Sequence, residues 1–194
     1  MTDATLKQQR KRAAKPMLWI GIASMVMMFA GLTSGYIVSR SYLMEESAWL
    51  QFEIPSIFYI STAIMLVSSG TMILAVKSSR KGQSVTATRW ILTSIVLGAG
   101  FAILQYFGWG ELYESNIYFA GAEANTAGSW FYVITAFHLL HWLGGWMALI
   151  VTAIRSSLGK YTENDHQGVE MAAIFWHFVD ILWVLLFLFL AINR

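Results

Sequence analysis

The amino-acid sequence predicts an all-α membrane protein, a bundle of five transmembrane helices. Hydrophobic residues make up 57% of the 194 residues and charged residues only 12%, whereas a soluble domain carries about 25% charged residues. The apolar residues form five runs, and each run has the roughly 20 residues that a helix needs to cross a bilayer. The charged residues gather between these runs, as in a chain that crosses the membrane several times.

The first predicted span, residues 17–39, contains no charged residue. It exceeds the apolar core of about 7–15 residues in a signal peptide, so we expect a retained helix. Gly31 and Gly35 have a spacing that lets a second helix approach closely. Residues 1–16 before it are predicted to form a basic cytoplasmic tail, disordered or lying on the membrane surface. Its basic residues are Lys7, Arg10, Lys11, Arg12 and Lys15.

The second predicted span, residues 55–76, follows an acidic loop and begins at Pro55. Proline is tolerated in the first turn of a helix because the N–H that it lacks has no partner there. The third predicted span, residues 90–110, begins at Trp90 and contains Gly98, Gly100 and Gly108. We expect these glycines at points of close helix contact.

The last two predicted spans, residues 130–154 and 170–192, carry polar residues within apolar runs. His138 and His141 lie in the fourth span, and His177 and Asp180 lie in the fifth. An aspartate at the centre of a membrane helix costs about 3 kcal/mol on insertion scales, so Asp180 is expected to face protein. The five spans are predicted to form a single membrane domain over residues 17–194.

The distribution of basic residues predicts the orientation of the chain. Eleven of the thirteen Lys and Arg residues lie in the N-terminal tail, in loop 77–89 or in loop 155–169. The two others, Arg40 and Arg194, belong to the opposite side. Because cytoplasmic loops carry the excess of Lys and Arg, the N-terminus is predicted inside and the C-terminus outside.

The polar residues of the last two spans are predicted to form a polar seam. Counting 1.5 Å per residue places His141 about 16 Å and Asp180 about 15 Å into the membrane. His138 shares a helix face with His141, and His177 shares one with Asp180. We therefore expect Asp180 within hydrogen-bond reach of His138 or His141, at about 3 Å or through one water. His177, one turn earlier on the same helix, is the alternative partner of the carboxylate.

This seam is interpreted as structural, and no catalytic, cofactor-binding or metal-binding residue is predicted. Two axial haem ligands would need similar depths, whereas His138 and His177 are about 10 Å apart in depth. A zinc or copper ion would take three or four converging ligands, and no ligand spacing supports such a site. A proton relay is the alternative, but the first four spans contain no carboxylate to extend it.

Several other classes of function lack their sequence motifs. The glycines are scattered through apolar runs, so there is no phosphate-binding loop, and there is no hydrolase triad. The basic loops are explained by membrane topology, so no nucleic-acid partner is expected. Without cysteine, the chain has no disulfide and no thiolate metal site.

The last three spans resemble subunit III of haem-copper respiratory oxidases. The fifth span carries this likeness in the run Trp176-His177-Phe178-Val179-Asp180-Ile181-Leu182-Trp183. The fourth adds Gly128-Ser129-Trp130-Phe131-Tyr132 and His138-x-x-His141-x-x-Gly144-Gly145, and the third adds Leu104-Gln105-Tyr106 and Trp109. We take Gln105, Trp109, Trp176 and Trp183 as signature residues. The likeness covers about residues 17–194, in the short five-helix bacterial form of the family.

The resemblance implies a non-catalytic core subunit of a proton-pumping terminal oxidase in a bacterial inner membrane. Haem and copper are then expected in partner subunits I and II, and none in this chain. The chain would pack on subunit I, hold phospholipid and support proton uptake. Cytochrome c is the expected electron donor, and a larger respiratory supercomplex is a further candidate partner.

Two residues depart from the family pattern. Met25 and Gly108 stand where many members carry glutamates within the membrane. This chain therefore lacks two carboxylates that could take part in proton uptake. The alternatives are a quinol oxidase subunit III and the accessory membrane protein of a nitric oxide reductase. An independent transporter or channel would show broken helices and internal repeats, and neither is visible in the sequence.

Overall fold

The computed structural model describes residues 3–45, 48–161 and 165–193, without the side chains of residues 3–8, 10 and 11. Arg194 and the side chains of Lys7, Arg10 and Lys11, all used in the charge count, therefore lie outside the described residues. The described part forms α-helices and no β-strand. The helices are α1 (Asp3–Glu45), α2 (Ile57–Arg80), α3 (Ser84–Glu114), α4 (Thr126–Ser157) and α5 (Gln167–Asn193). All five are long and apolar enough to span a membrane, which confirms the predicted all-α class.

The helices extend beyond the apolar runs that predicted them. Residues 3–16 are helical and continuous with the first span, which differs from the disordered form of the two that were predicted for this tail. Their Ala, Lys, Arg and Gln residues are strong helix formers. The helix α4 begins at Thr126 because the Asn125 side chain accepts a hydrogen bond from the Ala127 N–H at 2.8 Å, an N-cap.

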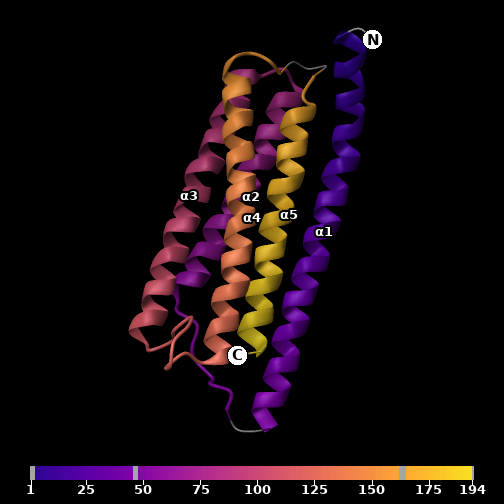
Figure 1. Ribbon diagram of the computed structural model, residues 1–194. Helices are drawn as coiled ribbons and strands as arrows, with labels where there is room; N and C mark the ends of the chain where they lie inside the picture. Colours follow the sequence, from indigo (N-terminus) through magenta and orange to yellow (C-terminus); the bar gives the residue numbers. More distant parts are fainter. Residues whose placement is uncertain (1–2, 46–47, 162–164, 194) are drawn as a thin grey trace.

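The helix α5 lies in the middle of the bundle and α1 lies at its edge (Figure 1). The helices α2 and α3 form a hairpin whose turn contains Gly82 at φ +69°, a left-handed conformation that favours glycine. The helix α5 packs against α2, α4 and α1, whereas α1 packs only against α4 and α5. Consequently α5 supplies much of the buried core, including the indole rings of Trp176 and Trp183.

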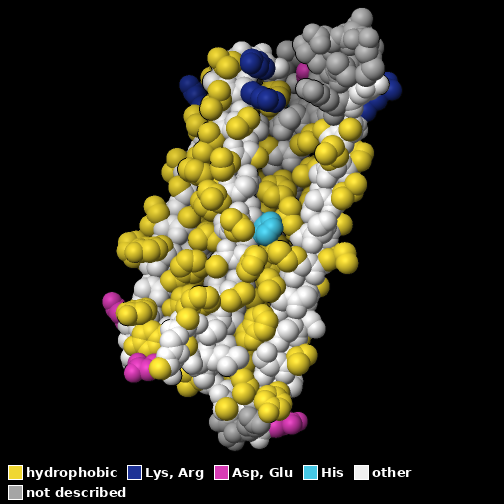
Figure 2. Space-filling view, in the orientation of Figure 1, with side chains coloured by type: hydrophobic (Ala, Val, Ile, Leu, Met, Phe, Trp, Pro, Cys, Tyr) yellow, Lys and Arg dark blue, Asp and Glu magenta, His cyan; other side chains and the backbone are white. Residues whose placement is uncertain are grey.

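Charge separates the two ends of the bundle. The start of α1, the turn between α2 and α3, and the start of α5 lie at one end (Figure 1). On the face shown in Figure 2, the Lys and Arg side chains in view lie at this end, and most of the acidic side chains in view lie at the opposite end. We call them the basic end and the acidic end. The bands of hydrophobic side chains between them face outward, as expected for a surface in contact with lipid or another membrane subunit.

A set of ion pairs joins three helices at the basic end. Glu170 of α5 accepts hydrogen bonds from Arg80 of α2, at 3.0 Å from Nε and 2.8 Å from the terminal nitrogen. Lys15 of α1 and His166 lie 3.5 and 3.3 Å from the same carboxylate. The Arg80 and Lys15 side chains are largely exposed, so each pair adds little stability, about 0–1 kcal/mol. The ion pairs instead hold the Glu170 carboxylate between α1 and α2.

Candidate functional site

The four signature residues share one role, which is to hydrogen-bond a hydroxyl group on a different helix. Each of them donates a side-chain N–H, and every acceptor is a serine or threonine. The pairs are Gln105 with Ser61 at 3.0 Å, Trp109 with Thr135 at 3.1 Å, Trp176 with Ser68 at 3.1 Å, and Trp183 with Thr62 at 2.9 Å. The signature residues therefore connect the helices of the bundle.

Three of these four acceptors lie on α2, and this helix carries the polar surface that our sequence analysis missed. Ser61 and Thr62 are repeated after seven residues by Ser68 and Ser69. Seven residues are close to two helical turns, so the two pairs occupy one side of the helix. We call these four residues the hydroxyl face of α2. The seven-residue spacing in the sequence could have indicated this face. It was passed over because serine and threonine hydroxyls in a membrane helix can bond to the backbone of their own helix.

His138 is fully buried and bonds to the backbone of α5. Its Nε2 lies 3.1 Å from the carbonyl oxygen of Val179, and because a carbonyl only accepts, Nε2 carries the proton. The imidazole ring also packs against Trp183, with 4.8 Å between ring centroids. His138 thus connects α4 to α5, although not through Asp180.

His141 turns away from the predicted seam. Its Nδ1 donates to the carbonyl oxygen of Phe137 at 2.7 Å, within its own helix. The ring makes an edge contact with Phe29 of α1, at 5.6 Å between centroids. His141 therefore lies between α4 and α1 and is separated from the polar residues of α5.

The polar residues of α5 face α2. His177 Nδ1 lies 2.6 Å from the hydroxyl oxygen of Ser69. Ser69 is also the polar side chain beside the carboxyl of Asp180, although the pair lacks the geometry of a hydrogen bond. Asp180 is only 1% exposed, and neither of its oxygens has a hydrogen-bond partner in the part of the chain that the structure describes.

The predicted direct hydrogen bond between Asp180 and His138 or His141 is therefore wrong for the described residues. The prediction assumed that α5 turns its polar face to α4, its neighbour in sequence. Because α5 lies in the middle of the bundle, its side chains have several helices to face, and those at 177 and 180 point to α2. The depth count was also one turn in error, since His138 rather than His141 is level with Val179.

Gly108, one of the two departures from the family pattern, has no room for a longer side chain. A Cβ atom at this position would lie 2.7 Å from the ring of Phe58 and 3.0 Å from Ile57. The close approach of α3 to α2 thus depends on glycine here. A glutamate at 108 would require these two side chains to move.

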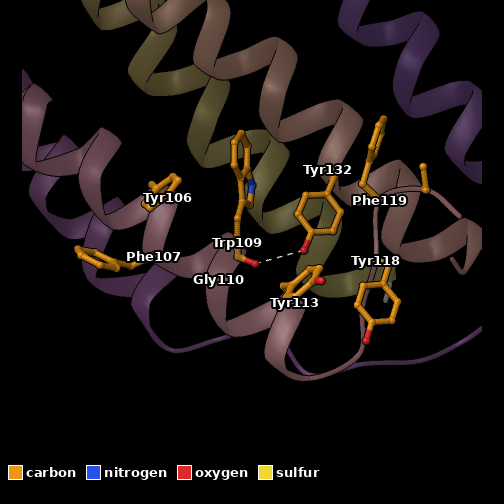
Figure 3. Close-up of a pocket in the computed structure, with 9 residues that line it drawn as sticks. Tyr106, Phe107, Trp109, Gly110, Tyr113, Tyr118, Phe119 and Tyr132 are labelled. Atoms are coloured by element: carbon orange, nitrogen blue, oxygen red, sulfur yellow. Dashed lines mark hydrogen bonds between the residues drawn. The ribbon is translucent and has the colours of Figure 1, made fainter. Parts of the chain in front are cut away.

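A pocket of about 460 Å³ lies at the acidic end, between α3 and the loop that leads to α4. Aromatic side chains dominate its lining, and Figure 3 shows them around Tyr132, whose hydroxyl donates to the carbonyl of Trp109 at 3.2 Å. The same hydroxyl lies 3.0 Å from the carbonyl of Ile117. Aromatic residues of this kind are typical of the boundary between membrane and water.

No group of three or more His, Cys, Asp or Glu side chains converges to hold a metal ion within residues 3–45, 48–161 and 165–193. The fold and the site thus define a polytopic helical membrane protein whose buried polar side chains mainly connect helices. The family described as cytochrome c oxidase subunit III matches residues 17–193 of the sequence. The chain belongs to the cytochrome c oxidase subunit III family.

Individual relatives agree with this family. A cytochrome c oxidase subunit 3 from Corynebacterium diphtheriae is 30% identical over 167 residues, covering 84% of this chain and 80% of the relative. A probable cytochrome c oxidase subunit 3 from Nocardia farcinica is 30% identical over 176 residues, covering 87% and 82%. A cytochrome c oxidase subunit 3 from Latimeria chalumnae is 38% identical over 136 residues, which cover 70% of this chain and 49% of that protein.

Proposed function

We propose that this chain is the non-catalytic subunit III of a proton-pumping cytochrome c oxidase in a bacterial inner membrane. The observation that carries the proposal is the use of all four signature residues in bonds between helices. Residues that recur in a family and connect helices preserve a surface on which other subunits can assemble. In this proposal, haem and copper belong to subunits I and II, and this chain packs on subunit I.

Two pockets beside α1 support a role in holding phospholipid. The first, of about 420 Å³ near the basic end, combines Arg155 with apolar side chains such as Leu18 and Phe175. The second, of about 310 Å³, lies further along α1 and is almost entirely apolar, with Phe29 and Phe189 in its lining. A cation beside apolar walls suits an anionic headgroup with its acyl chain.

The proposed orientation places the basic end in the cytoplasm. Reporter fusions after Arg10, near Gly82 and near Lys160 are expected to report the cytoplasm. Fusions near Glu46, Ala122 and Arg194 are expected to report the outside. The measurement is the ratio of a cytoplasmic to an external reporter at each site, and an external signal at Gly82 would overturn the topology.

Purification through a tag on this chain tests its place in an oxidase. We expect the tagged chain to bring down partner subunits with the visible absorption spectrum of haem. Because no haem ligand is proposed in this chain, His141→Leu should leave the haem content per assembled complex unchanged. A stable assembly without any haem-bearing subunit would contradict the proposal.

The same preparation separates the oxidase from its alternatives. Rapid oxidation of reduced cytochrome c, with little oxidation of quinol, supports the cytochrome c oxidase named in the relatives. Quinol oxidation or nitric oxide reduction would favour a quinol oxidase or the accessory protein of a nitric oxide reductase. An independent transporter would instead be active in vesicles that contain this chain alone.

A further inference from the structure

Asp180 is a buried carboxyl group that none of the functions above requires. It is 1% exposed, near the middle of a membrane helix, and its oxygens have no hydrogen-bond partner among the described residues. An ionised carboxylate in such surroundings is costly unless a cation or several donors face it. The neutral acid is therefore the form that this position favours, so the side chain holds a proton.

A pocket connects the neighbourhood of Asp180 with the basic end. This pocket, of about 390 Å³, lies between α2 and α5, with Lys15 of α1 at its border. Glu170, Lys77 and Arg80 line it at the basic end, and His177 lines it two helical turns further along α5. We call it the α2–α5 pocket. Its volume can hold several water molecules, each of which occupies about 30 Å³ in the liquid.

Polar groups continue from this pocket to Asp180. On α5, residues 170, 177 and 180 fall at spacings of seven and three, which place them along one side of the helix, and His166 directly precedes its first turn. His166 contacts Glu170, and His177 contacts Ser69 at 2.6 Å. Ser69 therefore lies against the side of α5 on which Asp180 follows His177 one helical turn later. A hydroxyl both donates and accepts, so Ser69 is suited to stand between an imidazole and a carboxyl.

On α5 the polar series stops at Asp180. On the side toward the acidic end, the next two turns of α5 present Trp183 and Phe187, which are buried and stack on each other at 6.1 Å between ring centroids. The other titratable group near this level is His138 of α4, whose Nε2 proton bonds to the Val179 carbonyl. Further toward the acidic end, the hydroxyl groups of Ser61 and Thr62 on α2 both donate their protons to the Phe58 carbonyl. Among the described residues, the series of groups that can pass a proton to Asp180 therefore leads from the basic end.

We propose that Asp180 is a proton-binding site that exchanges its proton with the basic end of the bundle through Ser69, His177 and the α2–α5 pocket. Loading starts from an ionised Asp180 and a neutral His177 with its proton on Nδ1. A hydronium ion that enters the pocket from the basic end protonates Nε2 and becomes water. The Nδ1 proton then passes to the Ser69 oxygen, and the Ser69 hydroxyl proton passes to Asp180. One proton has then moved from the pocket to the carboxyl. Ser69 is again a hydroxyl, and His177 is neutral with its proton on Nε2.

This site is a proton store and is distinct from a transmembrane channel, because beyond Asp180 the hydroxyl protons of Ser61 and Thr62 are bonded to the Phe58 carbonyl. It also does not depend on the two family glutamates that Met25 and Gly108 replace. In an oxidase that takes up protons, such a site would hold one proton near the middle of the membrane. Proton binding at Asp180 involves residues of this chain alone, so it can be tested whichever oxidase or reductase the chain belongs to.

Infrared spectroscopy of the purified protein, with whatever subunits accompany it, tests the protonation of Asp180. We expect a carboxylic-acid C=O band that is absent in Asp180→Asn. Asp180→Glu retains a carboxylic acid, so its band should persist at a shifted frequency. This second variant tests the assignment of the band even if Asp180→Asn assembles poorly. An unchanged spectrum in both variants would mean that Asp180 holds no proton and would overturn the proposal.

The exchange of that proton for deuterium tests the path. After transfer to D₂O, Ser69→Ala should slow the shift of the Asp180 band at least about tenfold, the effect of a barrier raised by about 1.4 kcal/mol. Ser69→Thr keeps the hydroxyl and should exchange at the wild-type rate. His177→Phe should also slow exchange, whereas the matched control His141→Phe, on the far side of α4, should not. Equal exchange rates in wild type, Ser69→Ala and His177→Phe would overturn the path.

Discussion

Replacing Trp176 with alanine is expected to destabilise the bundle by about 3–5 kcal/mol, the usual cost of deleting a buried indole. The ring is fully buried, and it extends from α5 to Ser68 of α2 and to Gly98 of α3. Its loss opens a cavity beside Gly98 and removes the hydrogen bond to Ser68. The midpoint of thermal unfolding of the purified complex measures the effect. Size-exclusion chromatography shows whether the variant chain stays in the complex.

Two further variants separate packing from hydrogen bonding at Trp176. Trp176→Phe keeps most of the ring and loses the N–H, so its effect should be well below that of alanine. The Ser68 hydroxyl still has the Ser94 carbonyl as a partner at 3.2 Å. Trp19→Ala, on the exposed side of α1, should change stability by no more than about 0.5 kcal/mol. Equal loss at Trp176 and Trp19 would refute the central position of α5.

Replacing Gly98 with valine should produce the second large loss. A Cβ atom at 98 would lie 2.8 and 3.1 Å from carbons of the Trp176 ring and 3.2 Å from Trp146. Because both indoles are held by hydrogen bonds, to Ser68 and to the Ile95 carbonyl, neither ring is free to move aside. Overpacking of this kind costs about 1–3 kcal/mol. The measurement is again the midpoint of thermal unfolding.

Gly100 supplies the matched control two residues away on the same helix. No atom lies within 4 Å of a Cβ built at this position, so Gly100→Val should be tolerated. A double-mutant cycle adds a second check. Gly98→Ala combined with Trp176→Phe should lose less stability than the sum of the two single changes, because the two sites are in contact. Strict additivity would show that Gly98 is not crowded by Trp176.

The number and position of the helices could be predicted because both depend on local properties of the chain. A run of about 20 apolar residues is stable in hydrocarbon only as a helix, whatever surrounds it. The ends of the helices were less predictable. The cap at Asn125 and the helical residues 3–16 lie outside the apolar runs, where hydropathy carries no information.

The candidate site was predictable only as a set of residues. Their identities, including His138, His177 and Asp180, stand out because polar groups are rare and costly in a membrane helix. The sequence also indicated the signature residues Gln105 and Trp176, without their hydroxyl partners. The partners of these two residues, Ser61 and Ser68, lie on α2, 44 and 108 positions away in the chain.

Local patterns were sufficient to predict a five-helix membrane bundle of the subunit III type, with an acid in its last helix. The rotation of the helices was not predictable, and it turns His177 to Ser69 on α2 and His141 to Phe29 on α1. The physical reason is the surroundings of α5. A helix in the middle of a bundle has neighbours on several sides, and its rotation is set by the packing of large rings such as Trp176 and Trp183. That packing depends on contacts between distant segments, which no local pattern in the sequence records.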